Sequence, residues 1–503
     1  MRATPTMAGS TGRPVAELHR RFERDSALSQ LWIDGESLAA PLDGTFLVED
    51  PSTTEPIGRV ADASPAEATR AVDAAAAAFE DWSSTPPRTR AEILRRAFDL
   101  MIADADYLAY LIMRENGKSL ADARGEVTYA AEFFRWFSEE AVRPEGSYAT
   151  APTGGVRAVV THRPAGVAVL VTPWNFPLAM VTRKVAPALA AGCTVVLKPA
   201  AETPLSALAI GQILARAGAP AGAFNVIPTV DAPTLVNTMI DDDRVRKLSF
   251  TGSTRVGRLL LRRAADRIVN CSMELGGNAP LIVGPGADVE TAVEGAMVAK
   301  FRNSGQACTA ANRFFVHADV ADAFLDQFGG RVAALKVGAP LQSDVEIGPL
   351  ISERAVRGVA QLVEHAVAQG ARISAQAPLG GSLNGYFYPP TVLDGVPIEA
   401  DILEQEIFAP VAPVVRWHEE DDLVQQVNRS EYGLAAYVFS RDLRWSLGLA
   451  ERLETGMVGI NRGLVSDPSS PFGGVKQSGI GREGAREGLR EFQETQSCLI
   501  DWT

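Results

Sequence analysis

The sequence predicts an α/β protein of two or more domains that is built on parallel sheets. At 503 residues the chain is too long for one small core, and two or three domains are expected. Between residues 167 and 272, short β-branched runs alternate with helical stretches, and a second pattern of this kind begins after residue 273. Alternation of this sort is typical of right-handed βαβ units and parallel sheets.

The first α/β region opens with a strand expected at residues 167–171. A helix over 178–191 should end at Gly192, and a second strand follows at 194–197. Thr203 and Pro204 should cap and open the next helix, which Gly218 stops. Further strands are expected at 224–227 and 247–250. Ligands of such sheets bind at the carboxyl ends of the strands.

A domain boundary is expected near residue 272. Beyond it the pattern predicts strands at 281–283 and 313–316 and helices over 319–335 and 354–369. Residues 65–126, which include an alanine run at 74–78, should be mainly helical. Residues 1 to about 25 are polar and interrupted by Pro and Gly, and we expect a loose N-terminal extension there.

Composition excludes several classes of function. Net charge is −13 without any basic run, which argues against nucleic acid and anionic membranes as partners. No apolar run of 18 residues and no signal peptide is present, and four cysteines offer no disulfide framework, so the reducing cytosol is the expected compartment. The five histidines are scattered, so no metal site is expected.

Cys308 and Glu274 carry the chemistry that the sequence suggests. Each lies in a segment with nearby glycines. A thiolate can add to an aldehyde carbonyl to give a hemithioacetal that releases hydride, and a carboxylate can activate the water that cleaves the resulting thioester. The thiol pKa, ordinarily about 8.5, should be lowered locally for this purpose. A single cysteine is, however, more often buried and inert.

Other candidates are ambiguous one by one. Gly252 and Ser253 follow a strand and open a helix, which suits a phosphate or a plain turn. Lys198 ends a strand, where it could contact a ribose or remain solvated. Asn175 could donate to an oxyanion or serve as a turn residue.

Residues 114–119 (RENGKS) imitate the end of a phosphate-binding P-loop. Position 112 is Ile instead of the required Gly, and no strand precedes the run. We therefore exclude a P-loop here.

Taken together, the motifs resemble the aldehyde dehydrogenase superfamily over roughly residues 30–503. The ordered strings are PWN at 173–175, KP at 198–199, FTGS at 250–253, ELGG at 274–277, GQAC at 305–308, EIF at 406–408 and PFGG at 471–474. The resemblance is strongest to the succinate-semialdehyde dehydrogenase branch, carried by PWNFPLAMVTRK at 173–184, LSFTGST at 248–254, MELGGNAP at 273–280, KFRN at 300–303 and GGVKQSG at 473–479.

The resemblance implies a role for each matching residue. Cys308 would be the nucleophile and Glu274 the base for deacylation, while Asn175 and the Cys308 N–H would form an oxyanion hole. Implied cofactor-binding residues are Trp174, Lys198, Ala201, Gly252, Ser253, Glu406 and Phe408. Implied substrate-binding residues are Arg183, Arg302 and Ser466, where two guanidinium groups would select an ω-carboxylate.

Three positions depart from the family pattern. Ala409 stands where Gly is usual, and Ala310 stands where some members carry a second cysteine for a redox switch. Ala201 replaces a Glu that NAD-specific relatives often place against the adenosine ribose, so NADP should be tolerated, although Glu202 is adjacent.

The resemblance implies three parts: a parallel-sheet dinucleotide-binding domain (26–144 and 164–272), an α/β catalytic domain (273–475) and a β-arm for oligomerisation (145–163 and 476–503). It implies oxidation of succinate semialdehyde to succinate with NADP or NAD by a cytoplasmic homodimer or homotetramer. Another ω-carboxy or aliphatic aldehyde, such as glutarate semialdehyde, is the alternative substrate. A non-catalytic descendant and a CoA-acylating relative are disfavoured by intact Cys308, Glu274 and Asn175.

Overall fold

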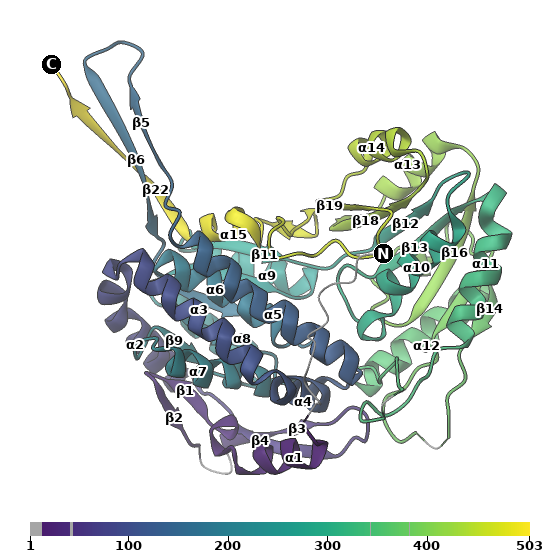
Figure 1. The fold of residues 1–503 in the computed structure, drawn as a ribbon, viewed down its shortest axis with the longest axis horizontal. Coiled ribbons are helices and arrows are strands. Elements are labelled where there is room, and N and C mark those ends of the chain that lie inside the picture. Colours follow the sequence, from purple (N-terminus) through teal and green to yellow (C-terminus); the bar gives the residue numbers. More distant parts are fainter. Residues whose placement is uncertain (1–12, 41–43, 343, 382) are drawn as a thin grey trace.

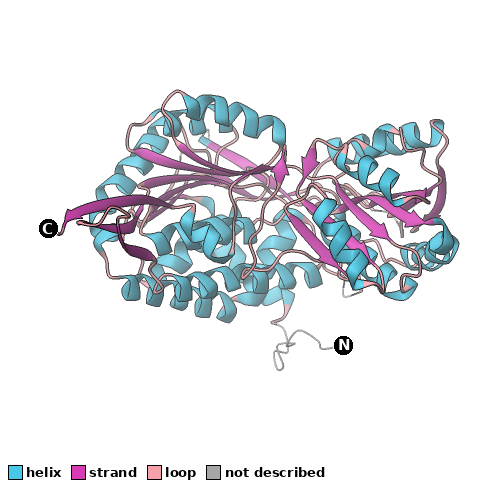
Figure 2. Cartoon of the chain, turned by 90° about the horizontal axis from the view of Figure 1, so that it is seen from above, coloured by secondary structure: helices cyan, strands magenta, loops and turns pink. Residues whose placement is uncertain are grey.

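The computed structural model describes residues 13–40, 44–342, 344–381 and 383–503. Two α/β bodies lie side by side, and a long β-arm projects from the first of them (Figure 1). Seen from above, each body holds a sheet between layers of helices (Figure 2). The α/β class with parallel sheets, expected from the sequence, is confirmed.

The first sheet has eight strands in the order β2-β1-β9-β8-β7-β10-β11-β21. The five strands from β9 to β11 are parallel, and the others pair antiparallel at the edges. The predicted strands at 167–171, 194–197, 224–227 and 247–250 all lie in this parallel core. The bounds are β1 (Leu31–Ile33), β2 (Glu36–Leu38), β7 (Val167–Val171), β8 (Thr194–Lys198), β9 (Phe224–Val226), β10 (Val245–Thr251), β11 (Asn270–Glu274) and β21 (Gly479–Ile480).

Side chains of β7 alternate between the two faces of this sheet, as strand geometry requires. Ala168 and Leu170 pack into one core, and Val167, Val169 and Val171 pack into another. Helices α3 to α7 cover the first face, and α2, α8 and α9 cover the second. Their bounds are α2 (Pro65–Ser84), α3 (Pro87–Ala103), α4 (Ala105–Asn116), α5 (Leu120–Glu140), α6 (Ala179–Ala191), α7 (Leu205–Ala217), α8 (Ala232–Asp241) and α9 (Thr254–Ala265).

The helix stops fall where the glycines predicted them, but one expected cap is wrong. Helices α6 and α7 end at Gly192 (φ +97°) and Gly218 (φ +93°), which adopt the left-handed conformation that favours glycine. Thr203 does not cap α7, because Pro204 holds the N-cap position and no side-chain cap is made from it. A distant carboxylate, Glu115, accepts the first free N–H groups of α7 instead.

The second sheet has seven strands in the order β14-β15-β16-β13-β12-β18-β19, parallel except for β14. Helices α10 and α11 pack on one face and α12 to α14 on the other. The bounds are β12 (Ala279–Val283), β13 (Ala311–His317), β14 (Arg372–Gln376), β15 (Thr391–Asp394), β16 (Val411–Trp417), β18 (Ala435–Phe439), β19 (Met457–Ile460), α10 (Val289–Phe301), α11 (Ala318–Ala333), α12 (Glu353–Ala368), α13 (Glu420–Asn428) and α14 (Leu443–Arg452).

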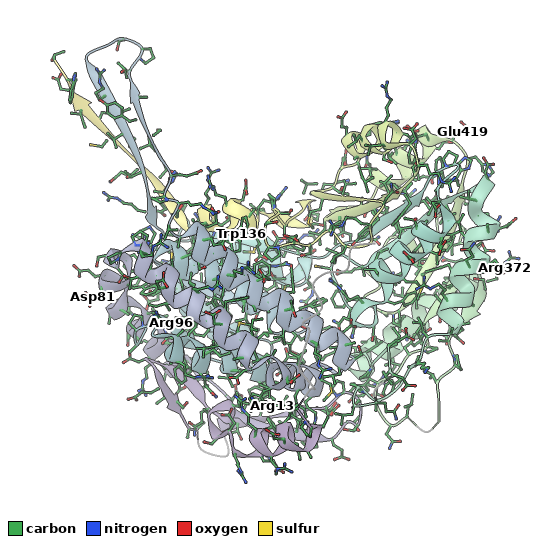
Figure 3. The ribbon with its side chains drawn as sticks, in the orientation of Figure 1. Arg13, Asp81, Arg96, Trp136, Arg372 and Glu419 are labelled. Atoms are coloured by element: carbon green, nitrogen blue, oxygen red, sulfur yellow. The ribbon has the colours of Figure 1, made fainter. Side chains whose placement is uncertain are left out.

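The projecting arm is a three-stranded antiparallel sheet in the order β22-β6-β5, with bounds β5 (Gly146–Thr150), β6 (Val156–Pro164) and β22 (Gln493–Asp501). Its strands are largely exposed, and its side chains project clear of the body (Figure 3). Residues 476–492, which the resemblance placed in the arm, lie elsewhere. There, β21 pairs with β11 and α15 (Ala485–Arg490) packs on α6, because buried residues such as Leu489 join the first core.

Two other expectations are corrected. Residues 13–25 are not loose, because α1 (Val15–Arg24) is a helix that packs on α4 and buries Leu18. Residues 1–12 lie outside the described part of the chain. Since β11 belongs to the first sheet and β12 to the second, the sheets separate between residues 274 and 279, slightly later than 272.

The smaller elements are β3 (Thr45–Glu49), β4 (Pro56–Ala61), β17 (Tyr432–Gly433), β20 (Val475–Lys476) and the short helices η1 (Ser26–Ser29), η3 (Arg302–Gly305) and η4 (Asp401–Leu403). Among the described residues, no helix combines the length and apolar character that crossing a bilayer requires.

Candidate active site

A cavity of about 1020 Å³ lies between the two bodies. Its walls come from the carboxyl ends of β7, β8 and β10 and from the loops around β13 and β16, as expected for parallel sheets. Eleven of the thirteen predicted site residues line it: Trp174, Asn175, Arg183, Lys198, Gly252, Ser253, Arg302, Cys308, Glu406, Phe408 and Ser466. The two that do not line it are Glu274 and Ala201.

The loop before Cys308 has an unusual backbone. Asn303, Ser304 and Gly305 have consecutive left-handed φ values of +52°, +55° and +74°. A Cβ at Gly305 would lie 2.4 Å from the carbonyl oxygen of Ala409, so only glycine fits there. Strain of this kind in non-glycine residues persists only where surrounding contacts hold it, and it is common at functional sites.

Asn175 is buried and tied to this loop. Its Nδ2 donates to the carbonyl of Gln306 at 3.2 Å, and its Oδ1 accepts the N–H of Phe176 at 3.1 Å. A second Nδ2 hydrogen remains, and the N–H of Cys308 has no acceptor among the residues that the structure describes. The site therefore holds two unused donors beside the thiol, the arrangement that stabilises an oxyanion.

The electrostatics of Cys308 contradict one expectation from the sequence. Burial raises the pKa of the Cys308 thiol to about 12, which Arg183 opposes and the carboxylates of Glu406 and Glu274 increase. The expected local lowering of this pKa is therefore wrong. No cation contacts the sulfur closely enough to offset its burial, so the resting thiol holds its proton at neutral pH.

Glu274 ends β11 in a buried position behind the cavity. Both of its carboxylate oxygens lack a hydrogen-bond partner among the described residues, and a Cβ at Gly473 would lie 2.8 Å from Oε1. Burial raises the pKa of Glu274 well above its ordinary value, and the neighbouring carboxylate of Glu483 adds to this shift. An unsatisfied buried carboxyl with a raised pKa is suited to accept and release a proton near neutrality.

One end of the cavity has the features of a dinucleotide site. Lys198 ends β8, is mostly buried, and has a pKa lowered by that burial. Gly252 and the exposed Ser253 connect β10 to the N-terminus of α9, and a Cβ at Gly252 would lie 2.5 Å from the Phe250 ring. A cation and a free helix N-terminus at one sheet edge fit the phosphates of such a cofactor.

Glu406 and Phe408 form the opposite wall at the middle of the cavity. Glu406 Oε1 accepts the N–H of Gly277 at 3.1 Å, and burial raises the pKa of Glu406 to about 7. Phe408 has a left-handed φ of +51° and packs edge-on against Trp174, with ring centroids 5.5 Å apart. Ala409 is buried and is not among the residues with positive φ, so alanine causes no backbone strain where Gly is usual.

The other end of the cavity is cationic. Arg183, on α6, is buried, and its Nη2 donates to Ser466 Oγ at 2.9 Å and to the hydroxyl of Tyr129. The Nη1 atom lies 3.5 Å from Glu483 Oε2, whereas Nε has no partner among the described residues. Arg302 stacks over the Phe176 ring at 5.0 Å and forms no ion pair with another described residue.

Tyr129 is the functional candidate that the sequence did not reveal. It lies on α5, lines the cavity, and bonds both Arg183 and Ser466. A lone tyrosine on a helix carries no motif, so only the fold could place it here. No group of three or more His, Cys, Asp or Glu side chains in the described part of the chain is arranged to hold a metal ion.

Residues 39–498 match the sequence profile of the Aldehyde dehydrogenase family. The chain is 52% identical to a succinate-semialdehyde dehydrogenase of Paenarthrobacter nicotinovorans, over 88% of this chain and 98% of that protein. It is 46% identical to a glutarate-semialdehyde dehydrogenase of Pseudomonas aeruginosa, covering 94% and 97%. It is 45% identical to an NADP(+) succinate-semialdehyde dehydrogenase of Escherichia coli, also covering 94% and 97%.

Solved structures are similar over nearly the whole chain. Succinate-semialdehyde dehydrogenase from Burkholderia pseudomallei superposes with a TM-score of 0.92 at 46% identity, covering 95% of this chain and 99% of that one. Betaine aldehyde dehydrogenase from Staphylococcus aureus in complex with NAD+ gives 0.93 at 31% identity, covering 97% of each chain.

Proposed function

The chain belongs to the aldehyde dehydrogenase family, and from that premise we propose that it oxidises succinate semialdehyde to succinate. The family assignment makes it an aldehyde dehydrogenase that uses NADP or NAD. The observation that carries the substrate proposal is the cationic end of the cavity, where Arg183 and Arg302 lie beyond Cys308.

We assign most of the cofactor binding to the first body, with Glu406 and Phe408 contributed by the second body. Lys198, Gly252 and Ser253 would hold the phosphates and ribose, Ala201 would lie beside the adenosine ribose, and Glu406, Phe408 and Trp174 would surround the nicotinamide end. When bound, the nicotinamide accepts the hydride that leaves the substrate carbon. The free N-terminus of α9 and the buried ammonium of Lys198 support this assignment.

In the proposed reaction, Cys308 Sγ releases its proton to solvent water and the thiolate bonds to the aldehyde carbon, whose oxygen becomes an oxyanion. Asn175 Nδ2 and the Cys308 N–H donate to that oxygen. When the carbonyl re-forms, hydride departs and a thioester remains on Cys308. Glu274 then removes a proton from water, and the water oxygen replaces sulfur at the acyl carbon to release the acid.

The carboxylate of the substrate would bind where positive charge is available. Arg302 has no competing ion pair among the described residues, and Arg183 has an unpartnered Nε, while Ser466 and Tyr129 hold its other face. Charge-assisted hydrogen bonds are worth roughly 1.5–3 kcal/mol each. Because about 1.4 kcal/mol corresponds to a factor of ten, each arginine should contribute about ten- to a hundredfold in kcat/KM.

The test is kcat/KM for succinate semialdehyde, glutarate semialdehyde and butyraldehyde with each cofactor. Butyraldehyde matches the four-carbon length without the charge, so the wild type should favour succinate semialdehyde strongly. Arg302→Gln should lower kcat/KM for the acid about ten- to a hundredfold and leave butyraldehyde almost unchanged. Equal losses for both substrates would reduce the proposal to a general aldehyde dehydrogenase, and a preference for the five-carbon acid would favour glutarate semialdehyde.

We also propose a cytoplasmic homodimer or homotetramer assembled through the arm. The arm exposes Tyr148, Leu499 and Trp502, whose side chains are 64%, 71% and 61% accessible, and all four cysteines are unpaired as a reducing compartment requires. Truncation after Phe492 should lower the mass measured by sedimentation, and an unchanged mass would contradict assembly through β22.

A further inference from the structure

The segment that imitates a P-loop has another position in the fold. Gly117 and Lys118 connect α4 to α5, and Lys118 is buried, with its side chain 0% exposed. Because the Lys118 ammonium is buried, it cannot bind a phosphate that approaches from solution. The ammonium instead bonds the loop that carries the candidate oxyanion donor, and that loop is bonded in turn to the loop of the nucleophile.

Two side chains of this segment, and one from α5, form hydrogen bonds with the loop after β7 and the start of α6. Asn116 Nδ2 donates to the carbonyl of Trp174 at 3.0 Å, and Lys118 Nζ donates to the carbonyl of Asn175 at 2.9 Å. Glu126 Oε1 accepts the N–H groups of residues 178 and 179 at 2.9 and 3.2 Å, where α6 begins. The backbone is therefore held on both sides of the Asn175 side chain.

The first turn of α5, which follows this segment, contacts the loop that carries the nucleophile. Asp122 Oδ2 accepts the N–H of Asn303 at 2.9 Å, the first of the three left-handed residues. Asn303 Nδ2 in turn donates to the Asn175 carbonyl at 2.7 Å, so that oxygen receives hydrogen bonds from both Lys118 and Asn303. One carbonyl thus joins the two loops to each other and to a buried cation.

Lys118 also forms a buried ion pair with Glu126, with Nζ 2.5 Å from Oε2 and both side chains fully buried. The ammonium lies 4.1 Å from the centre of the Phe176 ring. Buried hydrogen bonds of this kind hold the Lys118–Glu126 pair and the Asn175 carbonyl in place, because each group would lose a partner if another moved. Neither Lys118 nor Glu126 lines the cavity.

We propose that Lys118, paired with Glu126, is a positioning residue that fixes Asn175 as an oxyanion donor relative to Cys308. This inference rests on the proposed chemistry of these two residues. Small displacements of a preorganised donor reduce the rate of the chemical step while leaving substrate binding nearly intact. The competing explanation is that the ion pair only stabilises the first body.

A double-mutant cycle with Asn175 separates the two explanations. The measured quantity is the rate of the first-turnover NAD(P)H burst, with the aldehyde that the wild type uses best. Lys118→Met should slow the burst about 10- to 100-fold in the wild-type background. This loss is smaller than the loss expected when an oxyanion-hole donor is removed altogether. In the Asn175→Ala background the same change should cost less than about threefold, because the donor is already gone. KM should stay within about threefold.

The matched control is Lys247→Met. Lys247 is another fully buried lysine, 3.2 Å from Glu491, and it contacts neither loop. Both Lys247→Met and Lys118→Met should lower the Tm. Only Lys247→Met should keep the burst rate within about threefold of the wild-type rate. If Lys118→Met does not fold, the charge-neutral pair Lys118→Met/Glu126→Gln replaces it, since Gln can still accept from the start of α6, and the same result is expected.

Equal fold-losses in both Asn175 backgrounds would overturn the proposal, and so would an unchanged burst in a folded Lys118 variant. A wild-type burst rate in Asn175→Ala would remove the oxyanion role of Asn175 and this inference with it. Failure of the substrate proposal is visible separately, because it changes which aldehyde gives the fastest burst and leaves the cycle intact.

Discussion

The two ends of the cavity differ in how far their side chains are exposed to water. Around the half-buried Cys308 the carboxyl groups of Glu274 and Glu406 are shielded from water, and all three groups have raised pKa values. At the end proposed for the adenosine, Ser253 and Glu202 are exposed and α9 begins without a side-chain cap. Because charges interact strongly where water is excluded, a substitution near Cys308 should change activity more than one at the cofactor end, where water screens charge.

The largest effect should come from the sulfur itself. Cys308→Ala removes the only thiol that lines the cavity among the described residues, so no thioester can form and dehydrogenase turnover should be lost. The side chain is small and half-buried, so the fold should survive, as circular dichroism and Tm would show. Substantial turnover by the purified variant would remove Cys308 as the nucleophile.

Glu274→Gln should stall the enzyme after hydride release. Water lacks its base, so steady-state turnover should fall about 10²- to 10⁴-fold while the first turnover persists. Rapid mixing should show a burst near one NAD(P)H per active site followed by slow release. Loss of the burst would mean that Glu274 also deprotonates the thiol, and normal steady-state turnover would assign the base elsewhere.

The raised pKa values of Cys308 and Glu274 determine whether activity should rise or fall with pH. The pKa of Cys308 is raised to about 12 and that of Glu274 lies well above its ordinary value, so both are protonated at low pH and must lose their protons for reaction. Activity should therefore rise with pH, by up to about tenfold per unit, between pH 6 and 9. A rate that falls across this range would contradict protonated resting groups.

The smallest effect is expected at the cofactor end. Ala201→Glu should shift the NADP to NAD ratio of kcat/KM toward NAD by roughly tenfold, because a carboxylate repels a 2′-phosphate through partly screened charge. Glu202 already lines the cavity, so Glu202→Gln should move the ratio the other way. The wild type should use NADP at least as well as NAD. A hundredfold wild-type preference for NAD would contradict this expectation.

Local patterns in the sequence were sufficient for much of the fold. The strands of β7, β8 and β10 and the stops at Gly192 and Gly218 follow from runs of a few residues, since strand burial and left-handed glycine are local properties. The motif strings likewise named eleven residues that line one cavity, because loops at the carboxyl ends of β7, β8 and β10 meet loops that precede β13 and β16.

Contacts between residues far apart in the chain could not be predicted from the sequence and are set by the tertiary structure. Ser466 meets Tyr129 and Arg183 across 337 and 283 positions, and Glu115 replaces the expected Thr203 cap across 90 positions. Such pairings have no period or spacing in the chain. The sequence determined which groups can react, but the tertiary structure set their protonation and their neighbours, because pKa values and buried hydrogen bonds depend on what surrounds a group in space.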